Sequence, residues 1–483
     1  MEAAPPNLPP VPKISPSARL SSGRPQSLNW PLLALLVFLA GLVPIIVGFS
    51  LYFEFLGDES APNDTDLLAR AAPVPEEENG LVQLCTLNGT LLDFSAFATR
   101  SYKESVDLEA ILNGDEHDDV LVDSFLWQAR PALASLDNIL VLPHFEIPKV
   151  QTLNKQLAET PYAVDVRQVL ELSALRARQT GDFNLAVTEI KRLRRLATRF
   201  SENETDLVNL FTAGSLDERA ARAARDLLND PASTPASRAV LAQAWAVPFS
   251  WTTAMQRADC GEYRRMIYTF DHLPETISAN AHSGDTLEQI PKPLKDWGQR
   301  MILQRNRTRR EVAAVLRQIQ AALDGPYGKI DPSLTKSPHD ALAALPTNFP
   351  SNLVGEIFVQ MTTDMLRHEI ASPYLYSTQD RLVQTALAAR NYYDGNHALP
   401  QTLAALVPEY LPAVPLDPFD GQPLRYNPAR GLIYSVGTDL KDNGGSKSVD
   451  LPHEAKEYTD PLADKQQPTL VLRFQNSAPA ATP

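Results

Sequence analysis

The chain has 483 residues and 44% of them are hydrophobic, so it is long enough for two or three domains with cores of their own and too apolar to be disordered throughout. Its formal net charge of −14 provides no basic surface for a phosphate backbone, which argues against nucleic acid as a partner. With 40 prolines against 21 glycines, we expect loop-rich segments where the prolines gather, at the two termini and in the last third.

The N-terminal part combines a polar tail with one strongly apolar segment. Residues 1–28 are rich in Pro, Ser and Ala and have few large apolar side chains, which predicts a disordered tail. Within residues 29–56, the run from Trp30 to Phe53 carries no charge and exceeds the roughly 20 residues that a helix needs to cross a bilayer. Basic residues precede this run and acidic residues follow it, so the positive-inside bias places the tail in the cytoplasm and the rest of the chain outside it.

The apolar run predicts an uncleaved transmembrane anchor that contacts membrane lipid. A cleaved signal peptide is the alternative, but its apolar region usually has only about 7 to 15 residues, and no A-x-A cleavage site follows closely here. Residues 57–80 are acidic and contain prolines, which favours a linker between the membrane and the folded part.

Residues 81–376 show mainly helical periodicity. Apolar residues recur at helical spacing in two consecutive stretches, at Val166, Leu170, Leu172 and Leu175 and then at Phe183, Val187, Ile190, Leu193 and Leu196. Thr180–Asp182 interrupts the pattern, which predicts an antiparallel helix pair. The segment GDFNLAV is similar to the hairpin of tetratricopeptide helices, but it occurs once and without a period of about 34 residues, so we expect helical-repeat-like packing. Further helices are expected at 217–230, 297–323 and 354–367.

Two other features of this helical part allow two interpretations each. Cys85 and Cys260 lie far apart in the sequence and, on this topology, in an oxidising compartment, so they can form a disulfide or remain free. The stretch from Trp245–Trp251 to Ile290–Trp297 is rich in tryptophan and proline at its ends, which fits either the wall of a ligand groove or the anchoring of irregular segments on a helical core.

Residues 377–451 differ in character from the helical part. One helix is expected to end at Asp394-Gly395, with one face formed by Leu382, Thr385, Ala386, Ala389 and Tyr393. A short helix in LPQTLAALVPEYL, a double turn in VPLDPFDGQP and two strands in LRYNP and LIYSVG follow, which predicts a small hairpin on one long helix. Residues 452–483 are expected to form a C-terminal tail. The predicted fold class is mainly α, with a transmembrane helix, a helical extracytoplasmic domain and a small α+β module.

The order of these C-terminal elements resembles the globular domain of the major pseudopilins of type II secretion. The matching segments are YDG at 393–395, LPQTL at 399–403, DPFDGQPLRY at 417–426 and YSVGTD at 434–439. The resemblance covers about Ser377 to Leu451, and the helical part looks loosely like long bacterial single-pass membrane proteins with such an ending. It implies a bacterial inner (cytoplasmic) membrane protein whose bulk lies in the periplasm, with other envelope proteins as partners.

In that family the loop after the second strand binds calcium, so the resemblance implies a calcium site at Asp439, Asp442 and Asp450. Carboxylates and carbonyls on a flexible loop are the ligands that Ca²⁺ takes, and Gly444 and Gly445 allow the backbone to turn its carbonyls inward. Asp439 matches the family's first loop acid and Asp450 a later one, whereas Asp442 has no counterpart there. A Gly-rich turn without an ion is the alternative. An EF-hand is disfavoured because a strand precedes the loop and a lysine stands at its third position.

The sequence offers no catalytic or cofactor-binding motif such as HExxH, G-x-S-x-G or a P-loop. The pseudopilin processing signal is misplaced, because GFSLYFE at Gly48–Glu54 ends the apolar run instead of opening it. We therefore expect a membrane-anchored extracytoplasmic binding or scaffold protein and not a pilus subunit. Two alternatives stay open: an accessory component of an envelope secretion or pilus-like system, and an extracytoplasmic hydrolase whose site has no sequence motif.

Overall fold

The structure is a computed structural model that describes residues 42, 45, 47–48, 58–69, 74–91, 111–112, 117–147, 161–202, 205–271, 303–335, 352–445 and 468–472. The chain divides into two compact units, residues 1–57 and 58–483. The predicted disordered tail and most of the predicted membrane helix lie outside the described residues. Among the residues that are described, no helix is both long enough and apolar enough to cross a membrane.

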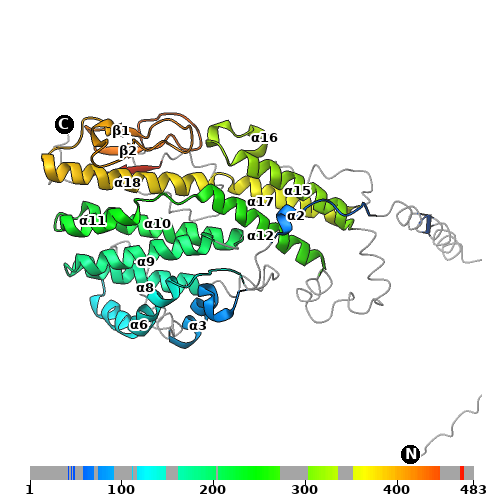
Figure 1. Cartoon of the computed structure of the whole chain (residues 1–483), viewed down its shortest axis with the longest axis horizontal. Coiled ribbons are helices and arrows are strands. Elements are labelled where there is room, and N and C mark those ends of the chain that lie inside the picture. Colours follow the sequence, from blue (N-terminus) through cyan, green and yellow to red (C-terminus); the bar gives the residue numbers. More distant parts are fainter. Residues whose placement is uncertain are drawn as a thin grey trace, which may run out of the picture. The chain divides into compact units, whose positions relative to one another are not determined.

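The second unit is mainly helical, as the sequence predicts, with one small antiparallel sheet (Figure 1). Its described helices are α2 (Thr65–Leu68), α3 (Gly80–Leu91), α6 (Asp119–Leu140), α8 (Pro161–Gln179), α9 (Phe183–Glu202), α10 (Leu207–Asn229), α11 (Pro235–Ala244), α12 (Trp251–Asp271), α15 (Arg305–Ala322), α16 (Pro332–Thr335), α17 (Leu353–Glu369) and α18 (Ser372–Asn396). Three short 3-10 helices are η1 (Glu76–Glu78), η3 (Tyr327–Lys329) and η4 (Leu403–Leu406). The sheet has the order β1-β2-β3, with β1 (Arg425–Asn427), β2 (Leu432–Tyr434) and β3 (Thr469–Val471).

The predicted helix pair is present as α8 and α9. The apolar positions that define it in the sequence face the core, where Leu170 and Ile190 are at most 1% exposed. Gly181 in the turn has a φ of 81°, a left-handed conformation that suits glycine because it has no Cβ. Asp182 then begins α9 by accepting a hydrogen bond from the Leu185 amide at 3.0 Å, which satisfies one of the free N–H groups of the first turn. The loop sequence therefore encodes both the end of α8 and the start of α9.

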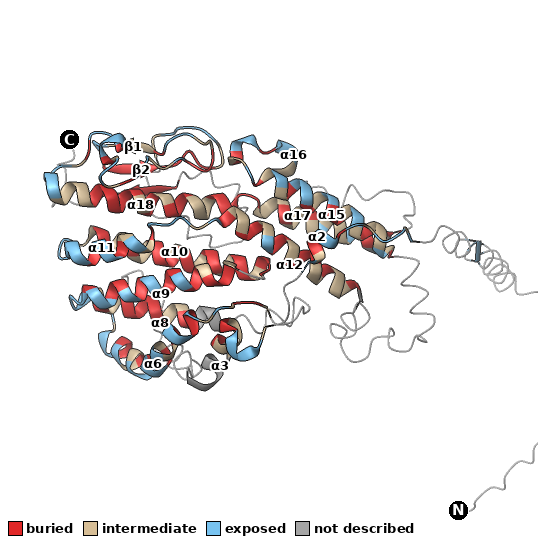
Figure 2. Cartoon of the chain, viewed as in Figure 1, coloured by how far each residue is buried: buried red, intermediate tan, exposed pale blue. Residues whose placement is uncertain are grey.

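Helix α18 is buried along most of its length because helices and sheet both pack against it (Figures 1 and 2). Leu382 and Ala386 of the face expected from the sequence are buried, and so are Val383 and Leu387 beside it, whereas Tyr393 of that face is half-buried. Helices α10, α11 and α12 contact α18, as do β2, β3 and η4. The predicted boundary between residues 376 and 377 therefore falls inside one helix that the helical body and the α+β module share.

A buried ionic cluster joins α9, α10 and α18. Arg194 of α9 donates hydrogen bonds to Asp217 of α10 and to Asp380 of α18, and all three side chains are at most 5% exposed. Trp251 of α12 donates its indole N–H to Asp380 at 3.2 Å, and the Trp245 ring lies 4.8 Å from the Arg194 guanidinium. Burial, and repulsion by Asp380, raise the pKa of Asp217 well above its usual value despite the contact with Arg194. Since one guanidinium neutralises one carboxylate, this favours a protonated Asp217.

The segment 58–69 is docked on the helices, so this part of 57–80 is not the free linker that its composition predicts. Asp64 is only 2% exposed and accepts hydrogen bonds from the Arg309 guanidinium at 2.8 Å and from the Tyr263 hydroxyl at 2.5 Å. Leu67 follows in α2 and is 1% exposed in the core. The acidic side chain that suggested a solvated spacer is instead a buried partner for an arginine of α15.

The predicted hairpin forms the strands β1 and β2, but a third strand completes the sheet. Leu432 pairs with Val471 and Tyr434 with Thr469, so β2 is the central strand. Leu470 is 5% exposed and belongs to the main core. Within the predicted C-terminal tail at 452–483, residues 469–471 therefore form a strand of the sheet.

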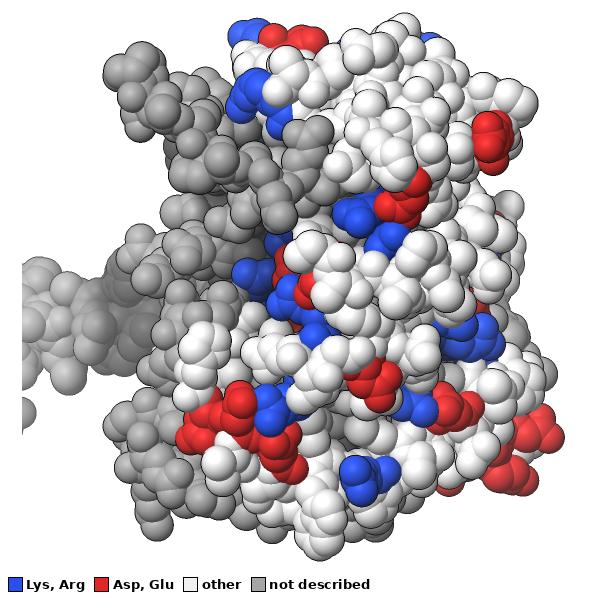
Figure 3. All heavy atoms as spheres, turned by 90° about the vertical axis from the view of Figure 1, so that its left-hand side faces the viewer, with Lys and Arg blue, Asp and Glu red and all other residues white. Residues whose placement is uncertain are grey.

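Acidic and basic side chains lie next to one another on the face shown in Figure 3. Several helices are linked by such pairs, for example Arg176 with Asp123 at 2.8 Å and Arg192 with Asp137 at 2.5 Å. Exposed pairs of this kind each contribute only about 0–1 kcal/mol to stability.

Asp259 of α12 is a buried acid without compensation. It is 0% exposed, and neither carboxyl oxygen has a hydrogen-bond partner among the described residues. Burial, with repulsion by Glu262, raises its pKa well above the usual value. The folded chain therefore keeps a proton that the unfolded chain releases above its ordinary pKa of about 4. The stability that this proton provides is fully present below about pH 4 and is lost as the pH rises through the raised pKa.

We predict that Asp259→Asn flattens this pH dependence. Asp259 should contribute a fall of up to about 1.4 kcal/mol per pH unit to the wild-type free energy of unfolding between pH 4 and its raised pKa, because this side chain releases one proton on unfolding in that window. The variant has no such proton, so its free energy of unfolding should increase relative to that of the wild type as the pH rises. Denaturant unfolding at pH 5 and pH 8 measures the difference. Glu77→Gln, at an exposed carboxylate, is the control, and equal pH slopes for wild type and Asp259→Asn would contradict the assignment.

Candidate functional site

The loop after β2 contains two of the three predicted calcium ligands. Asp439 accepts a hydrogen bond from the Lys441 amide at 3.0 Å and another from the Asn443 side chain at 3.0 Å. Both of its carboxylate oxygens are thus bonded within the loop. Asp450, the third predicted ligand, lies outside the described residues.

Asp442 is bonded to its surroundings in a similar way. One of its carboxylate oxygens accepts hydrogen bonds from the Tyr434 hydroxyl and from the Gly444 amide, both at 3.0 Å. Among the described residues, no group of three or more His, Cys, Asp or Glu is arranged to hold a metal ion. The calcium site stays a prediction that depends on Asp450 and on the loop's backbone carbonyls.

A different acid, Asp417, organises the α+β module. It is 0% exposed, and its carboxylate accepts hydrogen bonds from the Phe419 amide at 3.0 Å, the Ser435 hydroxyl at 2.8 Å and the Val436 amide at 2.8 Å. It therefore ties the DPFDG turn to the chain that leaves β2. Sequence analysis identified the turn but assigned no role to this acid. The DPFDG turn could have indicated this role of Asp417, because an Asp that precedes a proline in a turn commonly accepts hydrogen bonds from backbone N–H groups.

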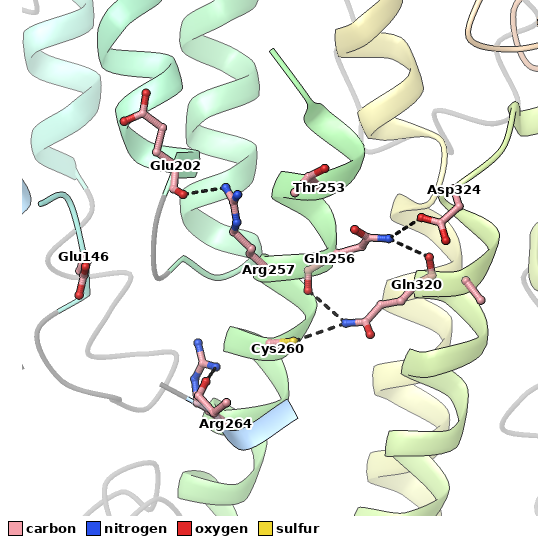
Figure 4. Close-up of a pocket in the computed structure, with 11 residues that line it drawn as sticks. Glu146, Glu202, Thr253, Gln256, Arg257, Cys260, Arg264, Gln320 and Asp324 are labelled. Atoms are coloured by element: carbon pink, nitrogen blue, oxygen red, sulfur yellow. Dashed lines mark hydrogen bonds between the residues drawn. The ribbon is translucent and has the colours of Figure 1, made fainter. Parts of the chain in front are cut away.

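A cleft of about 730 Å³ lies between α12 and α15 (Figure 4). Segments far apart in the chain line it: Thr253, Gln256, Arg257, Cys260 and Arg264 of α12, then Gln320, Ala321 and Asp324 of α15 and the turn after it, and finally Ala69, Glu146 and Glu202. The α12 residues stand three or four positions apart, which places them on one side of that helix. The other side of α12 is in the core, where Trp251 and Ala258 are 0% exposed.

Both arginines in the cleft hydrogen-bond to helix ends. Arg257 donates to the carbonyls of Ser201 and Glu202 at the C-terminus of α9, at 3.3 and 2.7 Å. Arg264 donates to Ala69 at 2.9 Å, the residue that ends α2. The last carbonyls of a helix have no partner within the helix and carry its negative dipole end, so a guanidinium is a suitable partner. These cations hold the walls of the cleft together.

An amide pair fixes the distance between α12 and α15. Gln256 donates to the Gln320 backbone carbonyl at 3.0 Å, and Gln320 donates to the Gln256 backbone carbonyl at 3.1 Å. Gln256 also donates to Asp324 at 3.1 Å, and Gln320 lies 3.5 Å from the Cys260 sulfur (Figure 4). This reciprocal pair holds the two walls in register along the cleft floor.

The thiol in the cleft is not activated. Burial raises the pKa of Cys260, so the thiol stays protonated near neutral pH and is a poor nucleophile. Cys260 forms no disulfide with Cys85 in the described structure, although the sequence allowed one. No histidine is among the lining residues that the structure describes. The lining is suited to hydrogen bonding.

The sequence did not predict this cleft. The tryptophan-rich stretch was one candidate for a groove wall, but Trp245 and Trp251 are 1% and 0% exposed, and both belong to the core. The usable signal was the polar spacing of Thr253, Gln256, Cys260 and Arg264, which interrupts the apolar pattern of α12 on one side only. Nothing in the sequence pairs this stripe with α15.

Comparison with protein-family models, with curated proteins and with solved structures finds no match for this chain. The site must therefore be interpreted from its own geometry.

The calcium prediction can be tested on the full chain by thermal unfolding. If the loop binds calcium, an excess of calcium should raise the melting temperature, because a ligand at about 100 times its Kd adds about 2.7 kcal/mol to the stability of the folded state. Asp439→Ala should abolish this calcium-dependent shift and cost little more than the loss of two loop hydrogen bonds when a chelator is present. If Asp439→Ala lowers the melting temperature by the same amount with calcium and with chelator, Asp439 is not a calcium ligand.

Proposed function

We propose that the chain is a membrane-anchored extracytoplasmic binding or scaffold protein that holds a polar segment of a partner protein in the cleft between α12 and α15. The observation that carries the proposal is the lining of the cleft. It presents amides, a hydroxyl and carboxylates over a volume of about 730 Å³, with no activated thiol and no histidine among the described lining residues.

The chemistry of the lining suits an extended peptide. Each peptide unit carries one donor and one acceptor. The two N–H groups of Gln256 already bond Gln320 and Asp324, and its side-chain carbonyl oxygen is the acceptor that it offers to a peptide N–H. The two guanidinium groups of the cleft already bond helix ends, whereas three acids, Glu146, Glu202 and Asp324, belong to the lining. The cleft therefore favours a neutral or basic polar segment over an acidic one.

Rigidity of the walls also supports a binding role. The Gln256–Gln320 pair and the two capping arginines fix the walls before any ligand arrives. A preformed site loses less conformational entropy on binding than a flexible one. The anchor at Trp30–Phe53 and the C-terminal resemblance to pseudopilins favour an envelope protein as the partner.

The binding proposal can be tested with a photo-crosslinking residue at Thr253 in the full chain, expressed in its own membranes. We expect one discrete adduct from this position, because Thr253 lines the cleft. The matched control carries the same crosslinker at Thr188, an exposed threonine on α9 outside the cleft. Ala321→Trp then fills the cleft without removing a side-chain hydrogen bond and should lower the adduct at least tenfold.

Two results would contradict the binding role of the cleft. One is an adduct of the same size and yield from both positions. The other is an adduct from Thr253 that is insensitive to Ala321→Trp, provided that the melting temperature shows the variant to be folded.

The anchor has a separate test. The full chain should remain in membranes washed with alkaline carbonate, because burial of the apolar run from Trp30 to Phe53 in lipid resists extraction. A chain that begins at Asp58, the first residue of the second compact unit, should appear in the soluble fraction. If both chains partition alike, the apolar run is not the anchor.

A further inference from the structure

A second, smaller site lies in the helical body. A slot of about 50 Å³ is formed by α8, α9 and α10, neighbours in Figure 1, together with Leu112. Its floor is aliphatic and consists of Ala174, Leu175, Ala186, Ile190, Ala223 and Leu227. Charged side chains surround this floor: Arg178 and Glu171 on α8, and Arg219, Arg222 and Asp226 on α10. The slot thus combines an apolar base with a charged rim.

The acids of this rim already have cationic partners. Glu171 lies between Arg219, at 3.5 Å, and Arg167, at 4.0 Å. Asp226 lies 3.6 Å from its neighbour Arg225. Neither acid is therefore left over to neutralise the remaining arginines of the rim.

Arg178 and Arg222 are those remaining arginines. Both are half-buried, and neither takes part in a hydrogen bond or an ion pair within the described part of the chain. Apart from Arg195, the other arginines of α8, α9 and α10 each pair with an Asp or Glu. Within α8, α9 and α10, Arg178 and Arg222 are the half-buried arginines that pair with no Asp or Glu of the described residues, and both line this slot. They leave a local positive charge over the aliphatic floor.

We propose that this slot binds the C-terminal residue of a peptide, with its carboxylate on Arg178 and Arg222 and an aliphatic side chain on the floor. A guanidinium binds a carboxylate through parallel N–H···O bonds, and an ionised carboxylate has about four acceptor sites, so one free carboxylate can accept hydrogen bonds from both arginines. The aliphatic floor contributes the burial of one apolar side chain, about 1.5–3 kcal/mol when burial is complete. The two arginines therefore recognise the carboxylate of the C-terminal residue, and the aliphatic floor recognises its side chain.

The volume of the slot limits the size of the apolar group that a bound carboxylate can carry. A water molecule occupies about 10–15 Å³ on the same measure, so about 50 Å³ accommodates a group of a few heavy atoms. One Leu or Val side chain satisfies this limit, whereas a long acyl chain exceeds it. An inorganic anion would bind the arginines without using the aliphatic floor. The proposal is independent of the cleft between α12 and α15, which shares no lining residue with the slot.

The test uses the full chain and two short probes, acetyl-Ser-Ala-Leu with a free carboxylate and the same peptide as its C-terminal amide. Ligand-observed NMR should show the acid to bind at least tenfold more tightly than the amide, since the amide removes the charge and keeps the side chain. Arg222→Gln should abolish this difference. Its melting temperature should stay unchanged, because Arg222 has no partner to lose in the described structure.

Arg195→Gln is the matched control. Arg195 is exposed on α9, also lacks a carboxylate partner and lies outside the slot, so this variant should keep the preference for the acid. Equal binding of acid and amide by the wild type, or the same loss in Arg195→Gln and Arg222→Gln, would overturn the proposal. Decanoate that binds as tightly as the peptide acid and depends on Arg222 would overturn the peptide as ligand. A peptide ending in Gly that binds as well as the one ending in Leu would exclude the aliphatic floor.

Discussion

The cluster of Arg194, Asp217 and Asp380 is the constraint on which the arrangement of the second unit depends. An unpaired buried charge costs several kcal/mol, so α9 can bury Arg194 only if α10 and α18 place their acids beside it. Asp380 lies 186 residues after Arg194, and Trp251 of α12 bonds the same acid. One guanidinium thus specifies the relative positions of helices that are far apart in the sequence.

In the same arrangement, α10 lies close to α18, and α12 lies close to the residues that precede α10. A Cβ at Gly214 of α10 would lie 2.1 Å from the Tyr376 ring of α18, and a Cβ at Gly261 of α12 would lie 1.9 Å from the carbonyl oxygen of Thr205. Both positions therefore require glycine for α10 to pack against α18 and for α12 to pass the start of α10. On its other side, α18 supports the sheet whose turn Asp417 holds, and Tyr374 and Phe419 pack together at 6.2 Å. The α+β module consequently has no core that is separate from that of the helical body.

Local patterns were sufficient to predict the elements whose signals are contiguous. The α8–α9 pair follows from apolar spacing around Gly181, and β1 and β2 follow from two short apolar runs on either side of a turn. β3 could not be predicted in the same way, because a strand of three residues gains its stability from pairing with β2, which is distant in sequence. Composition also could not predict that Asp64 bonds Arg309, because an acid in a polar segment can be either solvated or buried. The two candidate sites needed tertiary contacts, because α12 and α15 or α8 and α10 supply their opposite walls.

The capping arginines couple occupancy of the cleft to the segment that precedes the helical body. Arg264 lines the cleft and bonds the carbonyl of Ala69, at the end of the docked segment 58–69. An acidic ligand that took this guanidinium would leave the end of α2 without its partner and weaken the docking of that segment. A neutral or basic ligand that used Gln256 and Asp324 would leave the cap in place. The same hydrogen bonds that build the walls therefore make acidic ligands costly, and this selectivity arises from the fold before any partner contacts the cleft.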